Sequence, residues 1–389
     1  MKLHPSAQYP RGFLGIASHC GIKARGANDL ALIASEVAAN AAAVFTRNQV
    51  PGAPVTVGRE LIKGGRLQAI VVNSRVSNVG RGQEGIDNAR RMGAAAAKEL
   101  GIDTGLVLMS STGIIGAPLP IEKIEAGLVG LSARLENDPL IAARGIMTTD
   151  THPKALSISV GDATLTAVAK GSGMIAPNMA TMLVYLLTDA EIESAALDAM
   201  LRRTVDDTLN MLSIDSDTST SDSCVILANG MAGPVDATEF EGALRHLMTE
   251  LTEILARDGE GATRLLRIRV GGAEDRAGAR AIARSINDSP LVKTMVHGGD
   301  PNVGRILMAV GKVTTTPVDP DRIDARIGGQ PVLLAGRPTD FDASAVRAHL
   351  TSDTVEIEVH LGLGDGEARA WGCDLSQGYI EENGAYTST

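Results

Sequence analysis

Apolar runs alternate with segments of helical periodicity through the first third of the chain. Continuous apolar runs rich in β-branched residues favour buried strands, and apolar residues three or four positions apart favour helices that cover them. The predicted strands are 30–37, 41–46, 67–74 and 106–116, the last of which ends in a polar, glycine-containing turn, and the predicted helices are 87–101 and 121–135. Strands that alternate with helices fold into stacked layers. The pattern therefore predicts a layered α/β sandwich.

The same alternation continues through the rest of the chain. Strands are predicted at 155–160, 164–169, 182–187 and 265–270, and helices at 193–211, 239–259 and 275–288. The polar segment 213–223 is typical of turns and helix caps. Residues 355–376 form two strand patterns around a turn of Gly and Asp, which predicts a hairpin. A chain of 389 residues is long enough for two or three domains, yet no repeat or flexible linker marks a boundary.

Composition narrows the class of protein. The net charge of -10 argues against electrostatic binding to nucleic acid or to an anionic membrane. Aromatic residues make up only 2% of the chain while glycines number 43, so the core must consist of closely packed aliphatic side chains. Because there is no signal-peptide pattern and no apolar run of about 18 residues, we expect a cytoplasmic protein whose partners are small molecules or other subunits.

Cysteine and histidine give no sign of a metal site. Cys20, Cys224 and Cys373 are far apart and lack CxxC spacing, so reduced thiols are expected rather than a disulfide framework. The seven histidines show neither HxxxH nor HExxH spacing, so no metal is expected.

A serine triad is one alternative for the chemistry. His152 or His297 could serve Ser111 or Ser172 as a base, but no G-x-S-x-G elbow accompanies either serine. This alternative therefore has little support from the sequence.

The most informative segment is 170–183, KGSGMIAPNMATML. One interpretation is a dinucleotide-binding loop, because GSGMIA fits G-x-G-x-x-A after a predicted strand. Pro177 argues against it, since a proline would stand inside the helix that should receive the pyrophosphate. A second interpretation makes Thr181 an ordinary β-branched residue at the start of a buried strand.

The segment closely resembles the signature of the ornithine acetyltransferase family, whose members cleave themselves before the Thr of an Ala-Thr-Met-Leu motif. The resemblance runs along the whole chain in ordered blocks. These are PRGF at 10–13, AAAVFTRN at 41–48, STGIIG at 111–116, GIMTTDTHPK at 145–154, DSDTSTSD at 215–222, GEGATR at 259–264, DPNVGRILMAVG at 300–311 and the tail from Trp371.

The resemblance implies a self-cleaving fold of the DmpA/ornithine acetyltransferase type, an N-terminal-nucleophile enzyme. The chain would cut itself between Ala180 and Thr181, giving fragments 1–180 and 181–389 that stay associated and assemble further, as two of each fragment or a multiple. The freed α-amine of Thr181, with a reference pKa of about 7.7 to 8.0, would then activate the neighbouring hydroxyl. In this family the acetyl group passes from N-acetylornithine to glutamate by a ping-pong mechanism, and no obligatory cofactor is expected.

Other site residues follow from the matching blocks. Thr112 and Gly113 match the family's oxyanion pair, although a helix cap after a strand would look the same in the sequence. The positions that match the substrate-binding residues are Thr148 or Thr149, Lys170, Glu260, Asn383 and Ser388.

Two blocks depart from the family. Arg75 and Val76 replace small residues in a block close to N-S-G-N-A-N-A, and Val303 replaces the tryptophan of D-x-N-W-G-R. These changes suggest a paralogue with an altered acyl acceptor or donor, in a secondary pathway. The alternatives are a self-cleaving aminopeptidase or amidohydrolase of the same fold, a non-catalytic binding protein that keeps the fold, and a nucleotide-binding oxidoreductase.

Overall fold

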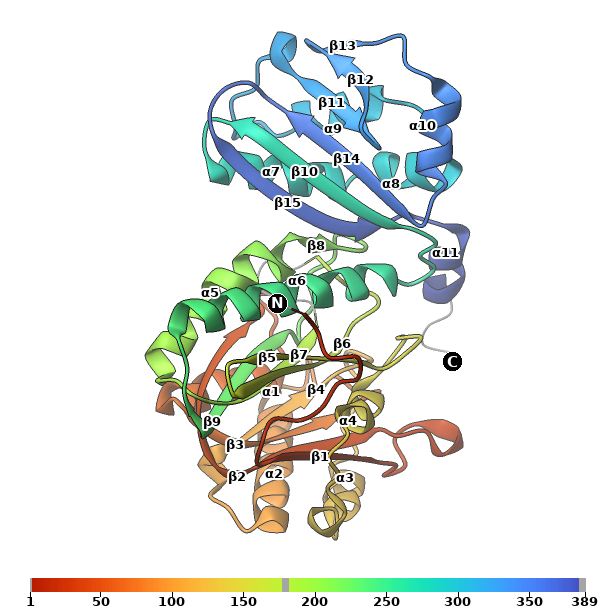
Figure 1. The fold of residues 1–389 in the computed structure, drawn as a ribbon. Helices are drawn as coiled ribbons and strands as arrows, with labels where there is room; N and C mark the ends of the chain where they lie inside the picture. Colours follow the sequence, from red (N-terminus) through yellow and green to blue (C-terminus); the bar gives the residue numbers. More distant parts are fainter. Residues whose placement is uncertain (1, 177–181, 385–389) are drawn as a thin grey trace. The chain divides into compact units, whose positions relative to one another are not determined.

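The structure is a computed structural model that describes residues 2–176 and 182–384. Its internal contacts divide the chain into two compact units (Figure 1). The first unit comprises Met1–Gly171, Asn178–Asp206 and Thr218–Leu251, and the second comprises Ser172–Pro177, Asp207–Asp217 and Thr252–Thr389. Both units draw on sequence from either side of Thr181. The predicted fragments 1–180 and 181–389 are thus a different, chemical division of the chain, which stays a prediction.

An eight-stranded sheet forms the centre of the first unit. Its order is β4-β3-β2-β9-β7-β6-β5, with β1 paired to β2. The β3–β4 and β7–β9 pairs are parallel and the others are antiparallel. The strands are β1 (Phe13–Ser18), β2 (Leu30–Phe45), β3 (Arg66–Asn73), β4 (Val107–Ser111), β5 (Lys154–Val160), β6 (Ala163–Lys170), β7 (Leu183–Glu191) and β9 (Ser223–Pro234).

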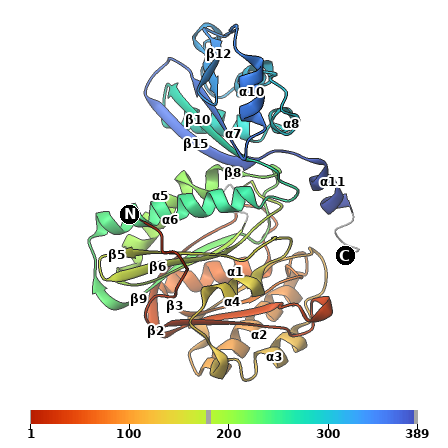
Figure 2. The ribbon, with the colours of Figure 1, turned by 45° about the vertical axis from the view of Figure 1, so that its right-hand side comes forward.

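Alternating aliphatic side chains give this sheet two buried faces. Leu32 and Val71 belong to a core cluster with α2 and α3, whereas their neighbours Ile33 and Ile70 belong to a cluster with α4 on the opposite face (Figures 1 and 2). Burying each such side chain contributes about 1.5 to 3 kcal/mol. The helices in this part of the chain are α1 (Ala53–Leu61), α2 (Gly82–Leu100), α3 (Ile121–Leu128), α4 (Pro139–Ile146), α5 (Ser194–Asp207) and α6 (Ala237–Arg257).

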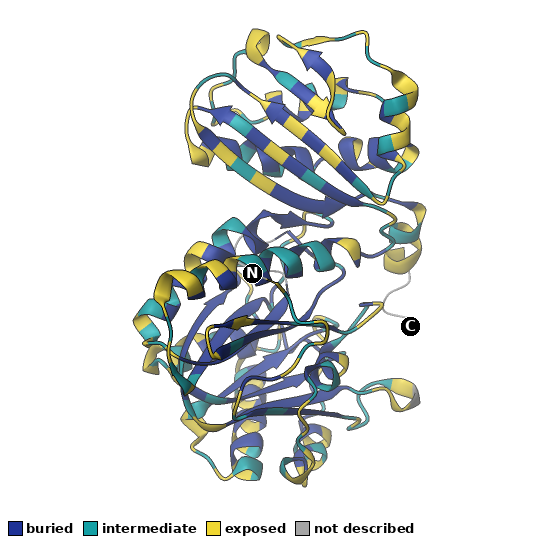
Figure 3. Cartoon of the chain, viewed as in Figure 1, coloured by how far each residue is buried: buried dark blue, intermediate teal, exposed yellow. Residues whose placement is uncertain are grey.

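The second unit contains a seven-stranded sheet in the order β13-β12-β11-β14-β10-β15-β8. Buried and exposed residues alternate along β14, so one face of the sheet is covered and the other carries polar side chains (Figure 3). The strands are β8 (Leu212–Ser213), β10 (Leu265–Ala273), β11 (Asp324–Ile327), β12 (Gln330–Leu334), β13 (Arg337–Pro338), β14 (Thr354–His360) and β15 (Gly366–Cys373). The helices are α7 (Arg276–Asn287), α8 (Pro290–Gly298), α9 (Gly304–Gly311), α10 (Ala343–Leu350) and α11 (Gln377–Gly384).

The layered α/β architecture is confirmed, but three predicted elements differ from the structure. Segments 30–37 and 41–46 form the single strand β2, whose pairing with β3 shifts register between Ala34 and Ala39. The helix predicted at 121–135 ends at Leu128. The predicted hairpin at 355–376 is wrong, because β10 lies between β14 and β15 and pairs with both.

Over residues 2–176 and 182–384, no helix has both the length and the apolar character that crossing a membrane requires.

Candidate active site in the first unit

Two neighbouring strand ends build the first part of the site. β3 and β4 run parallel with Asn73 opposite Ser111, so the loops that follow them leave the same edge of the sheet. The Ser111 hydroxyl donates to Asn73 Oδ1 at 2.6 Å, and Asn73 Nδ2 donates to the Val76 carbonyl at 2.8 Å. These buried hydrogen bonds hold the loop after β3 against Thr112 and Gly113.

Thr112 and Gly113 lie in a turn that leads to no helix. The next helix, α3, begins only at Ile121, so the helix-cap alternative is wrong. The Thr112 N–H donates to the Asn73 carbonyl at 3.1 Å and is therefore not available to a substrate. Its hydroxyl oxygen accepts from Lys170 Nζ at 3.4 Å.

The backbone N–H of Gly113 is the second donor of the predicted oxyanion pair. Within the part of the chain that the structure describes, this N–H has no hydrogen-bond partner. Gly113 has φ +124°, and a Cβ at this position would overlap the backbone of Arg75. The turn thus offers the Thr112 hydroxyl and the Gly113 N–H as two adjacent donors, the pair that an oxyanion needs.

A buried carboxylate ties two predicted substrate-binding segments together. The Asp150 side chain accepts from the Thr148 N–H at 2.9 Å, the Gly171 N–H at 2.6 Å and Lys154 Nζ at 2.7 Å. Burial alone would raise the pKa of Asp150, but the ammonium groups of Lys170 and Lys154 outweigh it and lower this pKa to about 2. Asp150 therefore stays ionised and fixes the residues next to Lys170 and at Thr148.

Lys23 brings a further cation to the same region. Its Nζ donates to the carbonyls of Asn28 and Met147, both at 2.8 Å. Burial, helped by the charges of Lys170 and Arg75 and opposed by the nearby carboxylates, lowers the pKa of Lys23 to about 8. Lys23, Arg75 and Lys170 are thus close enough for their charges to interact.

The strand after the predicted cleavage site begins beside Lys170. Leu183, the first residue of β7, pairs with Lys170, the last residue of β6. Thr181 precedes Leu183 by two positions in the sequence. Ala180 and Thr181 themselves lie outside the described residues, so their predicted roles remain predictions.

Three further predicted site residues belong to the second unit. Asn383 Nδ2 donates to Glu260 Oε2 at 2.8 Å, so these two are brought together as the resemblance implied. A Cβ on Gly173 would overlap the Glu260 carboxylate, which explains why a glycine is needed here in the KGSG segment. Ser388 lies outside the described residues.

The rival interpretations of these segments fail on geometry. β6 and β7, on either side of the glycine segment, are antiparallel, whereas a dinucleotide-binding unit needs parallel strands. The hydroxyl of Ser111 donates to an asparagine, and that of Ser172 donates to the Asp258 carbonyl at 2.6 Å. Neither serine therefore has the histidine base that a triad requires.

His297 and the three cysteines are also candidate chemistry-bearing residues. His297 Nδ1 lies 2.8 Å from Oδ2 of the buried Asp374, within the second unit. Cys224 and Cys373 are buried free thiols, as expected, while Cys20 is only half-buried.

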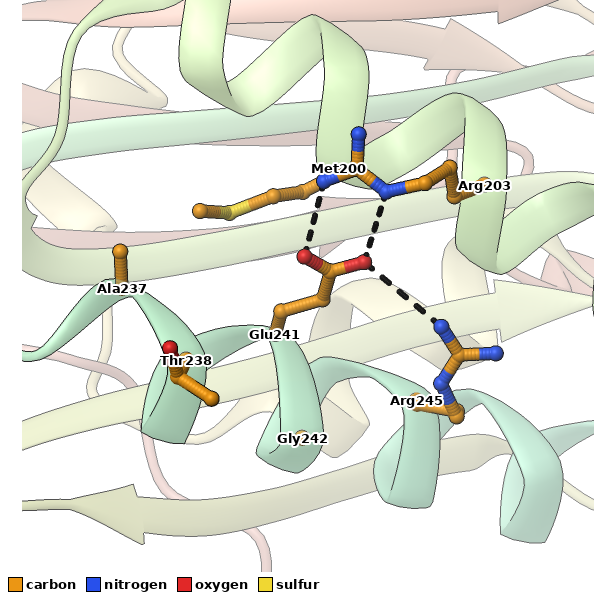
Figure 4. Close-up of a pocket in the computed structure, with 7 residues that line it drawn as sticks. All are labelled: Met200, Arg203, Ala237, Thr238, Glu241, Gly242 and Arg245. Carbon is orange, nitrogen blue, oxygen red and sulfur yellow. Dashed lines mark hydrogen bonds and ion pairs between the residues drawn. The ribbon is translucent and has the colours of Figure 1, made fainter.

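A surface hollow of about 450 Å³ lies between α5 and α6, and the described residues that line it include no predicted site residue (Figure 4). Its charged side chains contact one another: Arg203 makes two hydrogen bonds to the Glu241 carboxylate, and Arg245 lies 3.6 Å from it. The Arg203–Glu241 contact joins α5 to α6, and we assign the hollow no ligand.

Sequence reasoning missed Asp150, Lys154 and Lys23 as parts of the site. The signal for Asp150 and Lys154 was faint, because an acid and a lysine four positions apart usually indicate an exposed helical pair. Here both side chains are fully buried, and Lys154 is the first residue of β5. Lys23 lies in a loop with no distinctive motif.

Comparison with known proteins identifies the family of the chain. The ArgJ family matches residues 15–388. Glutamate N-acetyltransferase Oat2 of Streptomyces clavuligerus is 43% identical over 97% of this chain and 98% of its own length. Arginine biosynthesis bifunctional protein ArgJ of Thermotoga neapolitana is 44% identical over 97% of this chain and 99% of its own length. A solved ArgJ structure from Bacillus halodurans is 37% identical, covers 51% of this chain and 96% of the solved chain, and has a TM-score of 0.49. From the family match and these identities we conclude that the chain belongs to the ArgJ family.

Proposed function

We propose that the chain is a cytoplasmic glutamate N-acetyltransferase that moves the acetyl group of N-acetylornithine to glutamate through an ester on Thr181. Membership of the ArgJ family supports this activity. One structural observation carries the proposal: Lys170, opposite the first residue of β7, donates to the hydroxyl of Thr112 beside the free N–H of Gly113. This contact supports our assignment of the turn to the oxyanion, because the strand that follows Thr181 begins opposite Lys170.

The nucleophile arises by self-cleavage. The Thr181 hydroxyl attacks the carbonyl carbon of Ala180, the peptide C–N bond breaks, and the acyl group moves from nitrogen to oxygen. Water then hydrolyses this ester, leaving a carboxylate on Ala180 and a free α-amine on Thr181. That amine is the base that the weak threonine hydroxyl needs.

Acetyl transfer uses the same hydroxyl twice. Thr181 Oγ attacks the acetyl carbonyl of N-acetylornithine while the α-amine accepts its proton, and the returned proton lets ornithine leave as an amine. The glutamate amine then attacks the acetyl ester, which frees Thr181. Each tetrahedral oxyanion accepts hydrogen bonds from the Thr112 hydroxyl and the Gly113 N–H, a stabilisation worth roughly 2.7 to 4 kcal/mol per donor.

The family resemblance supplies the proposed binding residues, and charge complementarity supports their roles. Lys170 binds the substrate α-carboxylate through its ammonium group. Glu260 is buried, and its carboxylate suits a substrate amine. Asn383, Ser388 and a threonine of the pair Thr148 and Thr149 supply further hydrogen bonds.

The sheet order supports fragments that stay together after cleavage. β7 and β9 follow Thr181 in the sequence and lie between β2 and β6, which precede it. Cleavage would leave one sheet made from two chains. We expect these pairs to assemble further, as two of each fragment or a multiple.

Intact-mass measurement of the acetyl-enzyme tests the activity. With N-acetylornithine and no acceptor, the fragment that starts at Thr181 should gain one acetyl group as ornithine is released, and added glutamate should remove it as N-acetylglutamate. Thr181→Ala is the matched control and should gain nothing. Peptide hydrolysis without an acetyl adduct would instead favour the self-cleaving aminopeptidase.

A further inference from the structure

Arg75 has a backbone conformation that an arginine rarely adopts. Its φ is +89°, a region that costs a residue with a side chain roughly 1 to 3 kcal/mol and costs glycine almost nothing. The surrounding hydrogen bonds enforce this geometry: the Ile114 N–H donates to the Arg75 carbonyl at 2.9 Å, and the Ser74 N–H donates to the Asp29 carbonyl at 2.9 Å. A strained arginine where glycine would relieve the strain indicates that the side chain has a use.

The strained residue lies directly against the oxyanion turn. A Cβ on Gly113 would overlap the backbone of Arg75, so the two residues are in close contact. Arg75 is half-buried rather than extended into solvent. Its position is therefore next to the atoms where acyl transfer takes place.

The charge of Arg75 is not matched by a nearby acid. Within the described ranges, its guanidinium makes no ion pair or hydrogen bond. The acids of this region have other partners: Asp150 pairs with Lys154, and Asp29 accepts from the N–H groups of Cys20, Ile22 and Lys23. Because Lys23 and Lys170 already make the region cationic, an unmatched guanidinium suits an anionic ligand.

We propose that Arg75 is a specificity-determining residue that binds the side-chain carboxylate of the acyl acceptor, so that the acetyl-enzyme prefers dicarboxylic amino acids. This inference rests on the proposed function. In a ping-pong cycle donor and acceptor use the same site, so the guanidinium attracts the glutamate side chain and repels the ornithine side-chain amine. Arg75 thereby biases the acetyl-enzyme towards transfer to glutamate and against the reverse transfer to ornithine.

Partition of the acetyl-enzyme between glutamate and glutamine tests this role, because the two acceptors differ in side-chain charge but hardly in shape. The enzyme is acetylated with N-acetylornithine, freed of donor by gel filtration and mixed with each acceptor, and loss of the acetyl group is followed by intact mass. Arg75→Gln keeps the strained backbone and the side-chain length but removes the charge. It should lower the glutamate-to-glutamine preference about tenfold or more.

Three further variants make the result specific. Arg75→Lys keeps a charge without the guanidinium fork and should retain part of the preference. Arg75→Gly should lose the preference as Arg75→Gln does, yet unfold at no lower temperature than the wild type, because glycine relieves the strain. Arg134→Gln removes an exposed arginine of the same unit and should leave the preference unchanged.

The outcomes separate this inference from the proposed function. If the wild type forms no acetyl-enzyme, the proposed function fails. If acetyl-enzyme forms but Arg75→Gln and Arg75→Gly both keep the wild-type preference, Arg75 has no role in acceptor selection and the inference is overturned.

Discussion

Individual residues around Gly113 determine which hydrogen-bond donors the turn after β4 presents. Thr112 offers its hydroxyl because its N–H is occupied by Asn73, and Gly113 offers its N–H because no described residue accepts from it. Lys170 donates to the Thr112 oxygen, which leaves the hydroxyl proton available for an oxyanion. The donors depend on a backbone conformation that only glycine adopts at low cost.

Gly113→Ala should therefore impair catalysis more than a comparable substitution. The added Cβ would overlap the Arg75 backbone and displace the N–H, so acetyl transfer should fall about a hundredfold. Gly116→Ala is the control, because Gly116 also has a positive φ, +83°, but has open space around it. Steady-state rates for both variants decide the matter, and equal losses would contradict a special role for the Gly113 N–H.

Asp150 should make stability depend on pH in the acid range. The pKa of Asp150 is about 2 in the folded protein and about 3.9 in an unfolded chain. The contribution of the ionised Asp150 to the free energy of unfolding is therefore complete above about pH 4 and is lost as the pH falls through 2. Urea unfolding at a series of pH values should show this loss in the wild type.

Asp150→Asn removes that titration and leaves Lys154 as a buried charge without its carboxylate partner. It should lower the free energy of unfolding at neutral pH by about 3 to 5 kcal/mol and flatten the dependence between pH 4 and 2. If the free energy of unfolding changed with pH in the same way in the wild type and the variant, the lysines would not lower the pKa of Asp150, and the prediction would be wrong.

At the scale of elements, patterns local to one strand or helix were predictable and pairings between distant segments were not. β3, β6, β7 and β10 follow from their apolar runs. The hairpin at 355–376 was wrong because β10, about 90 residues earlier in the chain, pairs with both β14 and β15. Alternation of side chains predicts a strand but does not identify its neighbour.

The site shows the same limit. Thr112, Gly113 and Lys170 were found through motif blocks, and the structure brings them together. The strain at Arg75 and the three hydrogen bonds that Asp150 accepts depend on φ values and tertiary contacts, which no sequence pattern contains.

The interleaved sheet predicts how the cleaved protein behaves. Because β7 and β9 lie between β2 and β6, the two fragments should co-elute in native size-exclusion chromatography at any dilution. They should separate only at the denaturant concentration where the sheet unfolds. Separation on dilution in native buffer would contradict a shared sheet.

For the whole molecule, the chemical division and the compact units are independent. Each unit contains sequence from both sides of Thr181, so cleavage there would not release either unit as a separate domain. Segment 170–176 begins in the first unit with Lys170, the last residue of β6, and continues in the second unit with Gly173, which approaches Glu260. The chain just before the predicted cut therefore contains one predicted binding residue, Lys170, and a glycine that lies against another, Glu260.

The most direct test of the account is the covalent state of the purified chain. Denaturing electrophoresis with intact-mass measurement should show two fragments, one ending at Ala180 and one beginning with a free Thr181. Thr181→Ala should remain a single chain, while Thr181→Ser, which keeps the attacking hydroxyl, should still be cut. A wild-type protein that remains one intact chain of 389 residues while it transfers acetyl groups would contradict Thr181 as an amino-terminal nucleophile.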